Sequence, residues 1–148
     1  MSLSIRDSGN PTAARTVISS DGATAVLRAV EAKAAAMGVP AVIAVVDDGT
    51  ALKAFLRMEG TPPGAIRWAI DKAVTAAAFR APTHILDHAM QEAGSASALA
   101  SFMAQPHATL APGGFPLVID GAVVGAVGAS GGSPEQDQMM AEAGLAAL

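Results

Sequence analysis

Hydrophobic and polar residues follow two different periods along the chain, which predicts a mixture of helices and strands. From Asp21 to Met37 apolar side chains recur every three or four residues, the spacing that places them on one helix face. Residues 41–46 form a continuous apolar run, which is typical of a strand covered on both sides. Residues 50–58 alternate instead, so one side of that strand is apolar and the other carries charges such as Arg57.

Two Asp-Gly pairs, Asp48-Gly49 and Asp120-Gly121, each separate two apolar stretches. A two-residue hairpin turn needs a positive φ at its central residues, which glycine adopts without strain. The sequence therefore predicts two antiparallel hairpins with the same turn chemistry. One joins the two strands above, and the other joins residues 118–119 to residues 123–127.

Further helical patterns follow the first hairpin and close the chain. They cover residues 62–79, 83–91, 95–103 and 134–148. The order helix, hairpin, helices, hairpin, helix predicts an α+β domain over residues 20–148, with an antiparallel sheet and helices on both faces. Residues 1–19 show no sustained period and form a predicted N-terminal arm.

A glycine-rich loop, Ser130, Gly131 and Gly132, precedes the last predicted helix. Ser133 and Gln136 have the spacing of a capping box, which marks the helix start. Free backbone N–H groups and the positive end of the helix dipole then point at one spot. We expect this spot to bind a carboxylate or a phosphate.

The amino-acid composition predicts how the protein assembles and excludes several kinds of partner and chemistry. Charged residues make up 15% of the 148 residues, against about 25% in typical domains, and apolar residues make up 51%, so we expect a homo-oligomer. The net charge of −4 without a basic stripe argues against a nucleic-acid partner.

The absence of cysteine excludes disulfides and thiolate catalysis. We find no signal-peptide core and no run of membrane-spanning length, so we expect a cytoplasmic protein without a membrane partner.

The order of several short motifs resembles the GlcG/HbpS family, which includes the C-terminal domain of the PduO type. The matching pieces, spread over residues 21–148, are Asp47-Asp48-Gly49, Leu56-Arg57-Met58, Lys72-Ala73-Val74-Thr75-Ala76, Gly113-Gly114-Phe115-Pro116, the stretch from Asp120 to Gly132, and Glu135-Gln136-Asp137. The resemblance implies a profilin-like α/β/α sandwich with an antiparallel sheet of about five strands, and assemblies often larger than dimers. Some relatives bind haem or corrinoid-related ligands, so the resemblance also implies haem as a cofactor to test.

The histidines offer two kinds of site. His84 and His88 are four residues apart, so a helix places both on one face, where Glu92 or His107 would complete a metal site. The alternative is a solvated helix face with a His88–Glu92 pair. A histidine could also ligate haem while Arg57 or Arg80 binds the propionates. The chain has no Tyr and no Cys. We assign none of its three histidines to an axial-ligand position of the family.

Lys72 has apolar neighbours in its predicted helix. Either its stem lies along the helix surface, or its amine is drawn to a carboxylate in a pocket, with Asp47 as the natural partner. Asp47 is alternatively a turn residue. Glu135, in the first turn of the last helix, either complements the helix dipole or transfers a proton beside a bound ligand.

These residues support two main hypotheses. The first is a binding protein for haem, a related tetrapyrrole or a small anionic metabolite, in a pocket bounded by Gly113, Gly114 and the Ser130–Gly132 loop. The second is a cofactor-independent isomerase, lyase or hydrolase acting on a small carboxylate or oxo-acid in a catabolic pathway. In that enzyme Arg57 or Lys72 would neutralise charge, and Glu135 or Asp47 would move the proton. A third hypothesis is an accessory assembly subunit without chemistry; we place binding ahead of catalysis.

Overall fold

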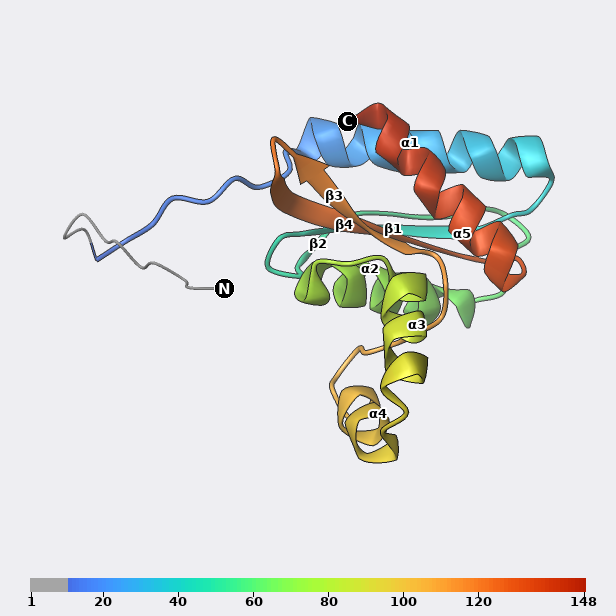
Figure 1. The fold of residues 1–148 in the computed structure, drawn as a ribbon. Helices are drawn as coiled ribbons and strands as arrows, with labels where there is room; N and C mark the ends of the chain where they lie inside the picture. Colours follow the sequence, from blue (N-terminus) through green and yellow to red (C-terminus); the bar gives the residue numbers. More distant parts are fainter. Residues whose placement is uncertain (1–10) are drawn as a thin grey trace.

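Four antiparallel strands form the sheet at the centre of the computed structural model, which describes residues 11–148 (Figure 1). Their order across the sheet is β2 (Leu52–Arg57), β1 (Val42–Asp47), β4 (Ala122–Ser130) and β3 (Gly114–Ile119). The predicted α+β class is confirmed, but the sheet of the described residues has four strands rather than about five. Residues 107–112, an irregular stretch or edge strand in the sequence, do not join the sheet.

Helices cover both faces of the sheet, as predicted. The face lined by Ile43 and Val45 packs against α1 (Ser20–Met37), α5 (Pro134–Ala143) and the 3-10 turn η1 (Gly144–Ala147). The opposite face, lined by Val42, Ala44 and Val46, packs against α2 (Ala65–Phe79). Alternate residues of β1 thus enter two separate cores, which explains its uninterrupted apolar run.

The two hairpins differ at their turns. Asp120 and Gly121 have φ angles of 50° and 79°, so the predicted two-residue turn is confirmed. In the β1–β2 hairpin the positive φ of 71° falls on Thr50 instead. The carboxylate of Asp47 accepts hydrogen bonds from the amides of Gly49 and Ala51, each at 2.9 Å, and this holds a longer loop. The prediction of identical turn chemistry is therefore wrong.

Small residues let α2 lie close to the sheet. Ala69, Ala73 and Ala76 of α2 are fully buried. Opposite them, a methyl group added at Gly128 would overlap the carbonyl oxygen of Ala69, and one added at Gly114 would overlap that of Lys72. This close approach places the side chain of Lys72 beside the end of β4.

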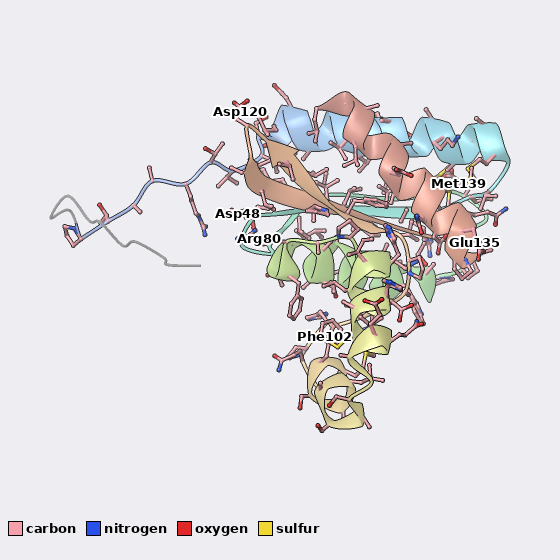
Figure 2. The ribbon with its side chains drawn as sticks, viewed as in Figure 1. Asp48, Arg80, Phe102, Asp120, Glu135 and Met139 are labelled. Carbon is pink, nitrogen blue, oxygen red and sulfur yellow. The ribbon has the colours of Figure 1, made fainter. Side chains whose placement is uncertain are left out.

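The remaining helices, α3 (Thr83–Ala93) and α4 (Ala96–Met103), extend away from the sheet on the α2 side (Figure 1). All residues of α4 are exposed except Phe102, which is labelled in Figure 2. Its ring centroid lies 4.9 Å from that of Phe79, at the end of α2. This aromatic pair is the main attachment of α4 to the rest of the fold.

The predicted N-terminal arm lies partly outside the described residues. Residues 11–17 are exposed and have neither helix nor strand, whereas Ile18 is buried and its amide donates to the carbonyl of Val124 at 2.9 Å. The sequence predicts that the first helix starts at Asp21 with that residue as its cap, but α1 begins after Ser19, whose hydroxyl accepts from the Gly22 amide and makes Ser19 the cap. The arm's boundary at residue 19 stays a prediction.

Within residues 11–148, no helix combines the length and the apolar character needed to cross a membrane.

Candidate ligand-binding site

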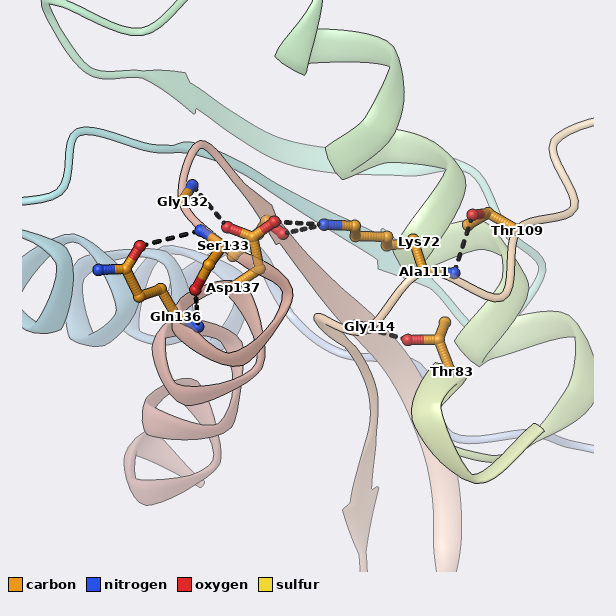
Figure 3. Close-up of polar contacts among 10 residues, drawn as sticks. Lys72, Thr83, Thr109, Ala111, Gly114, Gly132, Ser133, Gln136 and Asp137 are labelled. Carbon is orange, nitrogen blue, oxygen red and sulfur yellow. Dashed lines mark hydrogen bonds and ion pairs between the residues drawn. The ribbon is translucent and has the colours of Figure 1, made fainter. Parts of the chain in front are cut away.

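Lys72 lies in the middle of α2 with its side chain buried. Its ammonium group donates to Asp137 Oδ2 at 2.7 Å and to the backbone carbonyl of Ala129 at 3.0 Å (Figure 3). Asp137, in the first turn of α5, is buried too. A buried charge needs such partners, because an unpaired one costs several kcal/mol of desolvation.

The same carboxylate also holds the glycine-rich loop. Asp137 Oδ1 accepts a hydrogen bond from the amide of Gly132 at 2.8 Å. One aspartate therefore connects α2, the end of β4 and the start of α5. Sequence reasoning missed this role, although Met140 and Ala141 lie three and four residues further on and share its buried helix face.

Burial lowers the pKa of the Lys72 ammonium below its ordinary value of 10.5. Loss of water around the charged form is the largest cause, and the hydrogen bond and negative charge of Asp137 partly oppose it. An amine with a lowered pKa releases its proton more readily. Such groups concentrate at functional sites.

The loop amides are less available than the sequence suggests. The predicted capping box is present: the Ser133 amide donates to Gln136 Oε1 at 2.9 Å, and the Gln136 amide donates to Ser133 Oγ at 3.2 Å. With Gly132 bound to Asp137, three of the amides expected to hold an anion already have acceptors. The expectation of free N–H groups at these positions is wrong, because nearby polar side chains satisfy them locally.

A cleft of about 460 Å³ opens beside the buried pair. We call it the Lys72 cleft; its lining includes Lys72, Asp137, Ser130 and the loop glycines, together with Trp68 and Pro112. Its volume lies in the range of small-molecule sites, about 300–1,000 Å³. The side chain of Trp68 is largely exposed here.

The predicted site residues divide into those that reach this cleft and those that do not. Lys72, Ser130, Gly131 and Gly132 line it. Gly113 and Gly114 are buried and do not line it; the Gly113 carbonyl accepts from the Ala129 amide, and the Gly114 amide donates to Thr83 Oγ1 at 3.1 Å.

Three other predicted residues lie elsewhere. Glu135 is exposed at the start of α5 (Figure 2), and Arg57 is exposed on the edge strand β2. Asp47 is at the far end of β1 from Val42, the residue that pairs with Ser130, and five residues of strand span about 17 Å. The proposed Lys72–Asp47 pair is therefore wrong, and the lysine pairs with Asp137.

The two histidines proposed for a metal site make separate contacts. The ring of His84 lies 5.5 Å from that of Phe115, and His88 Nε2 lies 3.2 Å from Glu92 Oε1 on an exposed helix face. Among residues 11–148, no group of three or more His, Cys, Asp or Glu side chains is placed to hold a metal ion. A metal site at His84 and His88 stays a prediction without a third ligand.

Comparison with known proteins assigns the family. Residues 18–146 match the family model described as "Haem degrading protein HbpS-like". The chain is 38% identical over 118 residues to an uncharacterized 15.0 kDa protein of the dhaT-dhaS intergenic region of Citrobacter freundii, covering 80% of this chain and 82% of that protein. It is 34% identical over 116 residues to GlcG of Escherichia coli K12, covering 78% and 83% of the two chains.

A solved structure supports the same assignment. The crystal structure of a PduOC–haem complex has a TM-score of 0.81 and 31% identity, and the match covers 90% of this chain and 96% of that one. The fold and its lysine-based cleft define an α/β/α domain with room for a small ligand. The chain belongs to the HbpS-like family, and the predicted GlcG/HbpS resemblance is confirmed.

Proposed function

We propose that this protein binds a small ligand, with the Lys72 cleft as the site of a small anionic metabolite and haem or a related tetrapyrrole as a second ligand class. The observation that carries the first part is the buried Lys72–Asp137 pair at the wall of an open cleft. The haem-bound structural relative supports the second.

Lys72 keeps one donor for a ligand. An ammonium group has three N–H donors, and the Asp137 carboxylate and the Ala129 carbonyl take two of them. Ser130 adds a hydroxyl in the same cleft wall. Because the lysine and aspartate charges cancel, recognition depends on these directed hydrogen bonds rather than on a net positive field. A compact ligand with one carboxylate or phosphate fits this pattern.

Haem does not fit the Lys72 cleft by its chemistry. Within the described residues, its lining contains no His, Met, Cys or Tyr side chain, the usual protein ligands of haem iron. A second cleft, against a different face of α2, has an imidazole in its lining and is the better candidate for an iron porphyrin. When bound, haem would supply redox chemistry that the side chains of this chain lack.

The binding function is tested first on the purified full chain. Native mass spectrometry and an absorption spectrum identify any co-purified metabolite, metal or pigment and the number of subunits. Titrations with haemin, pyruvate, oxalate and phosphate, followed by absorbance or calorimetry, then measure affinity. Saturable binding of at least one probe is expected, and the absence of binding to all four would overturn the proposal.

A matched pair of variants locates the anion site. Ser130→Ala removes one hydrogen bond and should weaken anion binding about 2- to 10-fold. Ser101→Ala, on the exposed surface of α4, should leave the affinity unchanged. Equal affinities for both variants would place the anion outside the Lys72 cleft.

A cofactor-independent enzyme is the second candidate, and the lowered pKa of Lys72 favours it. In this version Lys72 neutralises the charge of a small carboxylate or oxo-acid, or transfers a proton to it. Glu135 and Asp47 do not line the cleft, so their predicted proton-transfer roles have no structural support here. The test follows oxo-acid conversion by NMR: turnover should be lost in Lys72→Met and retained in Glu135→Gln.

A further inference from the structure

A second cleft, of about 500 Å³, lies against a different face of α2. We call it the His107 cleft; its lining includes Pro63, Ile66 and Ile70 as apolar side chains and Arg67, Asp71 and His107 as polar ones. Successive helix residues are rotated by about 100°. Positions 66, 67 and 70 therefore lie on a different face of α2 from positions 65, 68 and 72, which line the Lys72 cleft, and Gly64 lines both clefts.

His107 is held in place from two directions. Its backbone has a φ of 62°, an uncommon conformation for a residue other than glycine. Its carbonyl accepts a hydrogen bond from Thr75 Oγ1 at 3.0 Å, and the same hydroxyl accepts from the Thr109 amide at 3.0 Å. The ring nitrogen Nδ1 lies 2.8 Å from Asp71 Oδ1. Helix α2 thus anchors both the main chain and the ring.

The Asp71 contact decides what the other ring nitrogen can do. A carboxylate at Nδ1 selects the tautomer that carries its proton there, which leaves the lone pair on Nε2. Histidines that ligate metals commonly have a carboxylate in this position, because it orients the ring and strengthens the nitrogen as a ligand. Nε2 of His107 makes no hydrogen bond within residues 11–148.

The surroundings indicate which metal species fits. No further His, Cys, Asp or Glu among the described residues completes a three-residue metal site, so a bare ion would find a single imidazole. A metalloporphyrin brings four nitrogen ligands of its own and needs only an axial one. The apolar side chains Ile66 and Ile70 suit its ring, and the guanidinium of Arg67 suits a propionate.

We propose that His107, oriented by Asp71, is the axial ligand of haem bound in the His107 cleft, with Arg67 binding a propionate. This inference deepens the proposed function and rests on its haem-binding part. It assigns the ligand to one of three histidines, and to a cleft whose lining shares only Gly64 with the Lys72 cleft.

The test titrates haemin into the full chain and into two matched variants. His107→Asn keeps a residue that tolerates the left-handed backbone, and His88→Asn is the control on an exposed helix face. Wild type and His88→Asn should show a saturable Soret shift and an electron paramagnetic resonance signal of ligated iron. His107→Asn should lose that signal and at least 10-fold in affinity.

Two further measurements separate ligation from a structural role. Asp71→Asn keeps the imidazole and should weaken haemin binding about 10- to 100-fold, and added imidazole should restore the Soret spectrum of His107→Asn. Bound haem should also quench the fluorescence of Trp68, the single tryptophan, which is adjacent to Arg67. Circular dichroism checks that each variant is folded.

The outcomes distinguish this inference from the function on which it rests. Saturable binding that is unchanged in His107→Asn would overturn the inference and leave haem binding intact. No saturable binding by wild type would overturn both, while anion binding at the Lys72 cleft would remain measurable by itself.

Discussion

Lys72 and Asp137 are 65 residues apart in sequence, yet their side chains form a buried ion pair with 2.7 Å between Nζ and Oδ2. The pair connects the helix on one face of the sheet with the helix that starts at the end of β4. Asp137 also holds the glycine-rich loop through the Gly132 amide, and both side chains line the cleft proposed for the ligand.

Loss of one partner of the Lys72–Asp137 pair should lower the free energy of unfolding strongly. Asp137→Asn leaves the lysine charge buried without its partner, which typically costs about 3–5 kcal/mol in the free energy of unfolding. The double variant Lys72→Met/Asp137→Asn should recover part of this loss. Urea unfolding of the wild type and the three variants gives the coupling energy.

An exposed pair is the control for that measurement. Arg28 and Glu31 lie 2.6 Å apart at the surface of α1, with side chains 63% and 32% exposed. Glu31→Gln should change the free energy of unfolding by less than about 1 kcal/mol. If Asp137→Asn costs as little as Glu31→Gln, the buried pair does not brace the fold.

The lowered pKa of Lys72 predicts a pH dependence. Between the folded-state pKa and 10.5, the unfolded chain binds more protons at this residue than the folded protein does. The contribution of Lys72 to the free energy of unfolding should therefore rise with pH across that window and be constant below it. Urea unfolding of the wild type, compared with Lys72→Met/Asp137→Asn from neutral pH to pH 10.5, measures the slope. A falling difference would contradict the direction of the shift.

Because α2 lies close to the sheet, we expect that Gly128 cannot be replaced by a larger residue without a loss of stability. Gly128→Ala would force a methyl group against the Ala69 carbonyl, so it should cost about 1–3 kcal/mol or more. Gly64, at the start of α2, has open space around it. Gly64→Ala should change stability by less than about 1 kcal/mol. Thermal and urea unfolding measure both, and equal costs would mean that the helix can shift away from the sheet.

The attachment of α4 through Phe102 predicts local rather than global unfolding. Phe102→Ala removes the ring that packs on Phe79, so amide exchange should accelerate across residues 96–103. Exchange in β4 should be unchanged. Leu99→Ala, at an exposed position of α4, is the control and should leave both segments unaffected. Faster exchange throughout the sheet in Phe102→Ala would show that α4 supports the core.

Local features of this fold were readable from the sequence because neighbouring residues determine them. The Asp120-Gly121 turn and the Ser133–Gln136 capping box depend on residues no more than three apart, and both are present. The conformation of the β1–β2 turn could not be predicted in the same way, because the carboxylate of Asp47, which precedes the Asp48-Gly49 pair, organises that loop. The number of strands came from family resemblance rather than from any pattern in residues 107–112.

The site depends on contacts that no local pattern encodes. Lys72 was recognisable as a charged residue among apolar neighbours, but its partner depends on which end of the sheet each segment reaches. The register pairs Val42 with Ser130, which places Asp47 at the opposite end of β1 and Asp137 beside the lysine. The Asp71–His107 contact likewise joins residues 36 apart. Both pairs needed the three-dimensional arrangement.

Because Phe102 is the one buried residue of α4, substitutions at the other positions of this helix should have little effect on the core. The outer surface of α4 carries little of the packing, so sequence drift there should be tolerated with almost no penalty to the sandwich. A cysteine introduced at Ser97 would consequently accept a fluorescent label without rearranging the body of the protein. The natural absence of cysteine makes such labelling selective for that one position.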